Sequence, residues 1–573
     1  SSRTMTGDIS ARGDIGAVIS VRGDGIHSDV SANEGRIGKV QAVGSSIFGS
    51  IRAGGAVQNV LAVGGNIAAS VESTGGRIGN VVSRAERSSS ENWSGGSVRG
   101  DLAASGDIDN VLAVYGDVGG AIDAGGRIGN VRAYRGGITG GPIMAGGPVH
   151  NIIAIGGDVD SSVTSENGRV GKVQARARYE RHLDGWIGGT VAGDVHAGTT
   201  VGRVIAVRGD GIDAMIEAGH GRVHTVKSVG GGISGGIQAS GPVHNVLAVG
   251  GDISASVRSI AGRVDNVIAY AGGPDEHRTG GSLIGDISAA RGIGNVLAIL
   301  GTGIDADIHA GDGRIANVRA VRGDIAGSVT ANGRIFTVYA LGGDVSADVR
   351  TKEGSDGRID KVIARGLSEG GTVSGDIQAD AGIGTVLAVD GDIDLTDSQV
   401  TAGSSVGSIR AVRGSILGDG VGSTADVHVQ GGSLGLLAAS RGSLLNADVR
   451  VTAESAPEGR TEGGDIGSVR MSGSRRGIVN SRLLARDGIL QNVSVTGLRS
   501  QEGLTRPGFR NSSIEARRLG RVVIHHGQIS EEAEDGEDQI HAEQGAFYAM
   551  DRDEAELIDD PTGHTFEGLK AWV

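Results

Sequence analysis

The sequence predicts an all-β fold, a parallel β-helix or solenoid, and three observations lead to this prediction. Glycine supplies 106 of the 573 residues, far more than an ordinary globular domain contains. A short phrase, G-x-[IV]-x-x-V-x-A, recurs along most of the chain. Its copies return at a nearly constant interval, which is typical of proteins that stack one repeat on the next.

The recurrent phrase has the alternation of a β-strand. In the copy GGRIGNVRAYRGG at residues 125–137, Val131 and Ala133 point to one face and Arg132 points to the other. A second phrase, [IV]-x-x-x-[IV]-x-A, lies between successive copies, as at residues 118–124. Glycines bracket both phrases and favour turns, and this density of glycine and β-branched residues disfavours a helix. Both phrases therefore predict strands.

The spacing of the first phrase sets the size of the coil. Its first apolar residue falls at 15, 37, 57, 78, 108, 128, 149, 170, 201, 223, 243, 264, 293, 315 and 335. One coil is therefore 20–22 residues, and every fourth step adds about ten, which gives a four-coil super-repeat of about 93 residues. A coil of thirty residues is the alternative, but only the shorter period stacks like phrases on each other. Parallel crossovers predict a right-handed coil.

The composition divides the chain into three regions. Residues 1–439 hold the regular solenoid with its super-repeat, and residues 440–527 are predicted to form irregular, basic terminal coils. Residues 528–573 carry fourteen acidic residues against two basic ones and contain aromatic side chains. This acidic segment either caps its own coils or docks on a neighbouring subunit.

The composition also argues against several classes of function. The chain has no cysteine, so no disulfide or thiolate metal site contributes. A net charge of −14 argues against nucleic acid as a partner. No run of eighteen apolar residues occurs, so no membrane-spanning helix is predicted. The first residues suit a mature secreted chain, and we expect an extracellular or cell-surface location.

The Gly-rich repeats of roughly residues 5–526 resemble those of parallel β-helix proteins of bacterial surfaces, such as autotransporter passengers and filamentous adhesins. The resemblance is architectural. It implies display, adhesion and self-association at the cell surface, and some branches of this group are enzymes.

Stacked coils place equivalent residues in columns of Asn, Arg and Asp. We interpret these columns as ladders that fix the register, because Asn side chains hydrogen-bond along such a stack. The alternatives are a linear surface polysaccharide lying along one column, or Ca²⁺ bound to the acidic column. No cofactor is predicted, since the repeat typical of calcium-binding β-rolls is absent. The acidic column comprises Asp117, Asp158, Asp252, Asp324 and Asp344.

Two short motifs suggest functions that the rest of the sequence does not support. The triplet Gly219-His220-Gly221 is similar to one in pectin-hydrolysing β-helix enzymes, but their paired carboxylates and Arg-Ile-Lys segment are absent. Arg-Gly-Asp occurs five times, and we interpret it as a by-product of the repeat, with receptor binding as the alternative. No catalytic residue is predicted.

The ends of the stack and its insertions are the predicted contact surfaces. A solenoid exposes unpaired strand edges at its ends, and such edges recruit other chains. The ten-residue insertions return every fourth coil, so they should protrude from one face, where they cover the flank or contact a neighbour. The interface candidates are Met5, Ile9, Trp93, Trp186, Phe547, Tyr548, Phe566 and Trp572.

The function expected from these features is a non-enzymatic structural subunit of an extracellular filament or surface layer. Copies of the chain would stack head to tail, with the acidic segment docking at the contact, because an end contact that does not close gives a filament. The alternative is a monomeric adhesin or display stalk that binds a glycan or a cell surface. A second alternative is a polysaccharide-degrading β-helix enzyme.

Overall fold

The computed structural model of the chain has β-strands as its regular elements throughout the described residues. Those residues are 4–87, 93–180, 185–273, 280–352, 357–367, 370–420, 424–455, 461–462, 464–474, 476–497, 499–500, 503–504, 508–525, 528–529, 538–545, 547–550, 555–558, 565–566 and 569–572. Within these ranges no helix could span a membrane.

Each coil consists of a long strand, a turn, a bridging residue, a short strand and a second turn. In one coil these parts are the long strand β16 (Ile128–Tyr134), the bridging residue Ile138 and the short strand β17 (Ile143–Ala145). The bridging residue and the short strand lie in line, because both belong to one strand in β25 (Gly211–Ala218). Two sheets therefore enclose the interior of the coil.

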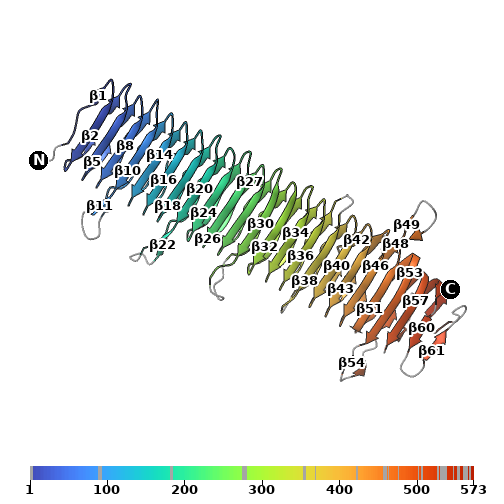
Figure 1. Ribbon diagram of the computed structural model, residues 1–573. Coiled ribbons are helices and arrows are strands. Elements are labelled where there is room, and N and C mark those ends of the chain that lie inside the picture. The colour runs from blue at the N-terminus through green and yellow to red at the C-terminus, as the bar shows by residue number, and fades with distance from the viewer. Residues whose placement is uncertain are drawn as a thin grey trace. The chain divides into compact units, whose positions relative to one another are not determined.

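The first compact unit, residues 1–289, is a stack of such coils (Figure 1). Its long strands are β2 (Ile15–Val21), β5 (Ile37–Val43), β8 (Val57–Val63), β10 (Ile78–Arg84), β14 (Ile108–Val114), β16, β18 (Val149–Ile155), β20 (Val170–Arg176), β24 (Val201–Val207), β26 (Val223–Val229), β28 (Val243–Val249) and β30 (Arg263–Tyr270). Its bridging and short strands are β1 (Ile9–Ala11), β3 (Ile26–His27), β4 (Val30–Ala32), β6 (Ile47–Phe48), β7 (Ser50–Ala53), β9 (Ser70–Ser73), β13 (Leu102–Ala104), β15 (Ile122–Ala124), β17, β19 (Val163–Ser165), β23 (Val195–Ala197), β25, β27 (Gly232–Ala239), β29 (Ser256–Ser259) and β31 (Ile287–Ala289).

The second unit, residues 290–573, repeats this arrangement and then becomes less regular. Its long strands are β32 (Gly292–Ile299), β34 (Ile315–Val321), β36 (Ile335–Leu341), β38 (Ile359–Arg365), β40 (Ile383–Val389), β43 (Val406–Val412), β46 (Leu434–Ser440) and β51 (Ile466–Ser474). Its short strands are β33 (Gly303–Ala310), β35 (Asp324–Ala331), β37 (Asp348–Thr351), β39 (Ile377–Ala379), β42 (Val400–Ala402), β45 (Val427–Gln430) and β48 (Asp448–Thr452). The bridging positions become a separate sheet of β41 (Ile393–Leu395), β44 (Ile416–Gly418), β47 (Leu444–Leu445), β52 (Gly477–Val479), β56 (Gly508–Arg510) and β58 (Gln528–Ile529).

The register confirms the predicted coil. Ile128 lies beside Ile108 in one neighbouring coil and beside Val149 in the other, and both pairings are parallel. The chain makes about 21 turns of about 22 residues each. The thirty-residue alternative is therefore wrong, because the same phrase pairs with itself at every step.

The interior is built from six inward positions in each coil. In the coil of β16 these are Ile128, Val131 and Ala133 on the long strand, and Ile138, Ile143 and Ala145 on the opposite side, all almost completely buried. Equivalent residues lie directly above and below them in neighbouring coils, so each unit has a continuous core of isoleucine, valine and alanine.

In most coils without an insertion, the turn after the long strand contains a residue in the left-handed region. Glycine holds this position in several coils, with φ of 83° at Gly44 and 79° at Gly64. Elsewhere the residue carries a side chain, with φ of 58° at Arg22, 62° at Arg208 and 62° at Arg322. These three arginines begin three of the five Arg-Gly-Asp sequences, so the motif coincides there with a turn of the repeat.

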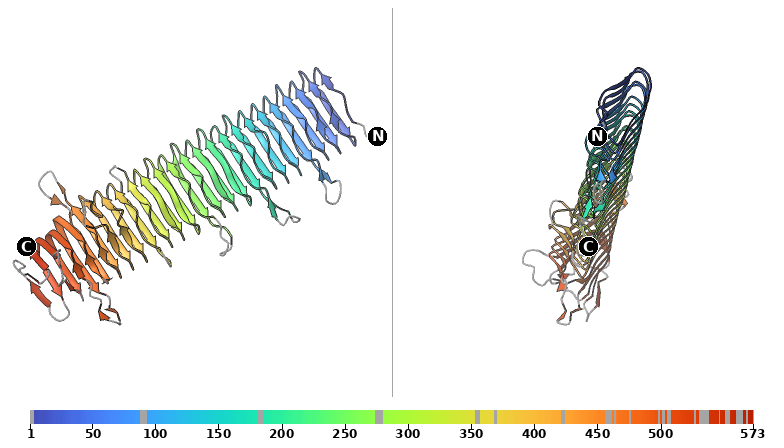
Figure 2. Two further views of the ribbon diagram at one scale, coloured as in Figure 1. Left: turned by 180° about the vertical axis from the view of Figure 1, so that it is seen from behind. Right: turned by 90° about the vertical axis from the view of Figure 1, so that its left-hand side faces the viewer.

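The predicted insertions leave the first unit at this same turn. Two of them are antiparallel hairpins, β11 (Glu86–Arg87) with β12 (Trp93–Ser94), and β21 (Arg178–Glu180) with β22 (Gly185–Ile187). Figure 2 shows both hairpins on one edge of the stack. Part of the third insertion, residues 274–279, lies outside the described residues.

The last strands of the second unit continue the stack by backbone pairing. β53 (Arg482–Gly497) pairs in parallel with β57 (Ser513–His525), which pairs with β59 (Asp538–Gly545), and β59 pairs with β63 (Leu569–Trp572). The acidic segment is thus attached through β59 to basic coils of its own chain. The remaining strands are the hairpins β49 (Glu454–Ser455) with β50 (Thr461–Glu462), β54 (Arg499–Ser500) with β55 (Gly503–Leu504), β60 (Phe547–Met550) with β61 (Ala555–Ile558), and β62 (Thr565–Phe566) with β63.

Candidate functional site

A ladder of asparagines runs along the outer face of the long strands. The Nδ2 of each amide donates to the Oδ1 of the Asn in the preceding coil, at 2.9 to 3.0 Å. Each amide satisfies its neighbour, so the ladder fixes the register. In the first unit it comprises Asn59, Asn80, Asn110, Asn130 and Asn151, followed by the pair Asn245–Asn266.

The predicted acidic column accepts hydrogen bonds from the backbone of the next coil. Asp117 Oδ1 accepts from the amide of Gly137 and Asp158 Oδ1 from that of Thr190, both at 2.8 Å. Among the described residues, no group of three or more His, Asp or Glu side chains is arranged to hold a metal ion. These carboxylates therefore have a structural role in the register. The other column members, Asp252, Asp324 and Asp344, accept in the same way from Ser282, Asp344 and Thr372.

Arginines before the long strands are paired with carboxylates in several coils. Arg127 Nε donates to Asp107 Oδ2 at 2.9 Å, and its Nη2 donates to Asp109 Oδ1 at 3.1 Å. The backbone amide of Arg127 also donates to Asp107, and this bond together with the guanidinium holds the pKa of Asp107 below its usual range. These arginines are neutralised by the carboxylates of adjacent coils.

This pattern breaks on the outer face of β18, β20, β24 and β26. Lys172, Arg203 and Thr225 occupy the ladder position where asparagine stands elsewhere. Gly171 and Gly202 come directly before Lys172 and Arg203, and a Cβ on Gly202 would lie 2.2 Å from the carbonyl oxygen of Gly171. The two glycines leave a hollow of about 630 Å³ between the surrounding side chains.

The hollow is lined by cations without neighbouring acids. Arg169, Lys172, Arg203 and Arg222 surround it, and His150 and His224 also line it. None of the four Lys and Arg side chains forms an ion pair with a described residue. None of the described residues that line the hollow carries a carboxylate. It is therefore a concentrated, unneutralised positive surface.

One histidine on this face, His224, responds to the same positive charge. Burial lowers the pKa of His224, and the positive charges of Arg222, His244 and Arg203 lower it further. The rings of His224 and His244 stack, with their centroids 5.2 Å apart. His244 Nδ1 lies 2.6 Å from Asp265 Oδ2, so that carboxylate is engaged outside the hollow.

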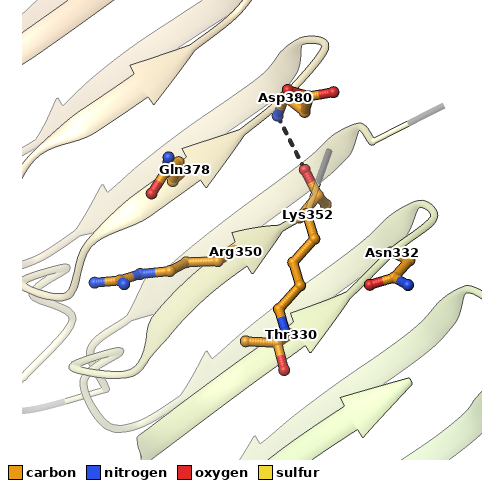
Figure 3. Close-up of a pocket in the computed structure, with 7 residues that line it drawn as sticks. Thr330, Asn332, Arg350, Lys352, Gln378 and Asp380 are labelled. Carbon is orange, nitrogen blue, oxygen red and sulfur yellow. Dashed lines mark hydrogen bonds between the residues drawn. The ribbon is translucent and has the colours of Figure 1, made fainter. Parts of the chain in front are cut away.

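A second hollow, in the second unit, has paired charges. Figure 3 shows Thr330, Arg350 and Gln378 on the neighbouring strands β35, β37 and β39, with Lys352 extending toward Thr330. The volume is about 690 Å³. Arg350 Nη2 lies 2.6 Å from Asp376 and 3.1 Å from Asp348, so its charge is balanced within the fold.

A third, acidic hollow of about 320 Å³ contains Asp397, Asp419 and Asp426. Burial raises the pKa of Asp426 to about 7, against the effect of hydrogen bonds from the amides of Asp448 and Asp419. Asp426 is thus a buried carboxyl that keeps its proton up to a pH well above the usual pKa of an aspartic acid. Its Oδ2 accepts from the amide of Asp448 at 2.6 Å, which places it in the register of the coils.

The insertion tryptophans lie on the flank of their own unit. Trp93 stacks on Tyr115 with ring centroids 3.9 Å apart, and Arg135 lies 4.1 Å above the same tyrosine. Trp186 lies 4.0 Å from the guanidinium of Arg208. Each insertion thus folds over the left-handed turn of the following coil. Both indoles keep an exposed face, and a lateral contact there stays a prediction.

The first strands of the chain present a strand edge. Met5 bridges Ile26, and Ile9 pairs with Val30, so both predicted interface residues belong to the stack. β2 pairs with β5 on one side, and no described strand pairs with its other side. The side chains of Ile19 and Val21 on β2 are 47% and 60% exposed.

The remaining predicted residues add little to the site. His220 is exposed in a turn, where its backbone amide donates to the carbonyl of Gly198. Four interface candidates are predicted near the C-terminus: Phe547, Tyr548, Phe566 and Trp572. Their side chains lie outside the part of the chain that the structure describes.

Sequence reasoning did not single out the cationic hollow. Its signal is the replacement of Asn by Lys172 and Arg203 in two successive coils. That signal is visible only when residues 170 and 201 are aligned across the insertion between them.

No protein-family model, curated protein or solved structure matches the chain. The β-solenoid fold is shown by the structure itself. The likeness to bacterial surface proteins remains one of architecture.

Proposed function

We propose that the chain is a non-enzymatic structural protein that assembles with copies of itself outside the cell, as a subunit of a filament or surface layer. The unpaired edge of β2 carries this proposal. The long strands from β5 to β28 each pair on both sides, whereas β2 pairs only with β5 among the described strands. An edge of this kind offers free N–H and C=O groups to another strand.

The side chains on β2 strengthen this argument. Ile19 and Val21 project outward at the free edge and are the most exposed apolar pair in the first coils. Their burial against a second copy is favourable by roughly 25 cal/mol for each Å² removed from water. The same edge on two copies gives a closed dimer, whereas contact between unlike ends gives an open filament.

Light scattering on the purified 573-residue chain tests the proposal. We expect growth of particles with concentration, and fibres or sheets by electron microscopy. The double substitution Ile19→Lys and Val21→Lys should suppress growth, because charged side chains at a strand edge oppose its pairing with another chain. Ile284→Lys is the matched control, since Ile284 is equally exposed but lies away from β2. Single particles of the unmodified chain at every concentration would refute the proposal.

The acidic segment provides a second arm of this experiment. β59 pairs with β57 of the same chain, and β57 carries Arg517, Arg518 and Arg521. This supports a cap on its own coils. Removal of residues 528–573 should then leave growth at the β2 edge intact, whereas loss of growth would support docking of this segment on a neighbour.

A second candidate is an adhesin or display stalk that binds a polysaccharide. The cationic hollow in the first unit favours it, because an unneutralised cluster of this kind attracts a polyanion. Self-assembly and binding along the flank use different surfaces, so one protein can perform both.

A further inference from the structure

We propose that the hollow between β18 and β26 binds an acidic polysaccharide, a linear glycan that carries carboxylate or sulfate groups. This binding uses the flank of the first unit and does not depend on self-assembly through β2. The ligand class follows from the charge, the shape and the chemistry of the lining residues.

The charge of the hollow requires an anion. Arg169, Lys172, Arg203 and Arg222 converge on one surface without an acidic partner among the described residues. In a coil of the same unit the equivalent arginine, Arg127, is bound by two carboxylates. Four like charges held close together repel one another, and a bound anion removes this repulsion. Arginine also binds carboxylate and sulfate through two parallel hydrogen bonds.

The shape of the hollow favours an extended ligand. The lining residues come from four successive coils, which span about 14 Å along the stack at the spacing of parallel strands. Gly171 and Gly202 form the floor, and the Cβ that any other residue would add there meets a backbone carbonyl. We call this hollow the trough, because its lining follows four coils along the stack; in the sequence Arg169 precedes Gly171 and Lys172 follows it.

The other lining groups match a sugar chain. Asn151, Thr199, Thr200 and Thr225 line the trough and can hydrogen-bond to hydroxyl groups. Among the described lining residues, the histidine rings are the only aromatic groups. Proteins that hold single-stranded nucleic acids stack the bases on aromatic side chains, and the described lining offers only histidine rings for such stacking. A glycan with spaced anionic groups fits this surface better.

The chain itself supplies the design of a specific variant. Asp107 occupies the same position in its coil as Thr200, and its carboxylate binds both the amide and the guanidinium of Arg127 in the next coil. Thr200→Asp should bind Arg222 in the same manner and place a negative charge in the trough. Thr200→Asn is the matched uncharged control.

The test measures binding of dextran sulfate, polygalacturonate, uncharged dextran and single-stranded DNA to the whole chain. The Ile19→Lys and Val21→Lys variant is used as the background, so that assembly does not interfere. We expect at least one charged glycan to bind, with an affinity that falls as salt rises. Thr200→Asp should weaken binding about tenfold, and Arg169→Ala with Arg222→Ala about a hundredfold. Arg127→Ala, which lies outside the hollow, should change it less than about threefold. Thr200→Asn keeps an uncharged hydrogen-bonding side chain at this position, so it should weaken binding less than Thr200→Asp does.

Three results would overturn the proposal. The first is the absence of binding to both charged glycans. The second is equal affinity of the chain with Thr200→Asp and the chain that keeps Thr200. The third is binding of DNA as tight as that of the glycans. A preference between dextran sulfate and polygalacturonate identifies sulfate or carboxylate as the recognised group. Failure of binding leaves the assembly result unaffected, because the two are measured on different surfaces.

Discussion

Replacement of Ile143 by alanine should destabilise the first unit strongly. Ile143 is 1% exposed and lies between Ile122 and Val163 of the neighbouring coils. Backbone hydrogen bonds hold these coils at a fixed spacing, so the neighbours cannot move into the space that the side chain leaves. Ile→Ala substitutions cost about 2–5 kcal/mol, and a site that cannot collapse lies in the upper part of that range. We therefore expect a loss of about 4 kcal/mol.

Met144 provides the matched control for this substitution. It is the next residue of β17, has a side chain of similar size, and is 38% exposed. Met144→Ala should cost less than about 1 kcal/mol, as surface substitutions do. Urea denaturation followed by circular dichroism measures both variants, and hydrogen exchange shows whether the loss is confined to nearby coils, as expected for a repeat stack. Equal losses for the two variants would refute the assignment of the inward face.

Two further substitutions test the buried carboxyl and the left-handed turn of the second unit. The pKa of Asp426 is raised to about 7 in the fold. Its stabilising contribution is therefore complete below the pKa of the unfolded chain and is lost as the pH rises from there to the folded pKa of about 7. Asp426→Asn should therefore gain stability relative to the unmodified chain by about 3 kcal/mol between about pH 4.5 and about pH 8, measured by urea denaturation. A constant difference across this range would contradict the assignment. Arg441 is exposed and has a φ of 57°, so Arg441→Gly should raise the free energy of unfolding by about 0.5–1 kcal/mol. Arg410→Gly, in the extended strand β43, should lower the free energy of unfolding by about as much. A lower free energy of unfolding for both variants would contradict the left-handed conformation of Arg441.

The sequence was sufficient to predict the coil because every coil uses the same inward residues. Ile128 and Val149 occupy the same place in two copies of one phrase, and the structure pairs them. The Asn ladder followed from the same alignment, since equivalent residues in a parallel stack must be neighbours. Repetition therefore made the interior and the register readable without tertiary information.

The rest depended on contacts between residues far apart in the chain. The stacking of Trp93 on Tyr115 requires the insertion to fold over the following coil, and no local pattern indicates this. Arg22 has the sequence of an ordinary exposed cation, although the turn holds it at positive φ. The cationic trough depends on which acids are absent around Arg169 and Arg222. That absence becomes visible only when the coils are placed beside one another.

Engineered cysteine pairs test the stacked register most directly. The chain has no cysteine of its own, so each pair can be observed without interference. Asn110 and Asn130 are partners in adjacent parallel strands, about 4.8 Å apart, which is within the range for a disulfide. Asn110 and Asn151 are two coils apart, at about 9.6 Å, which is too far.

We expect Asn110→Cys with Asn130→Cys to form an intramolecular disulfide on mild oxidation, detected by mass spectrometry of the folded chain. Asn110→Cys with Asn151→Cys should stay reduced. Cross-linking of the second pair in preference to the first would contradict the coil of 20–22 residues on which the trough and the strand edge both depend.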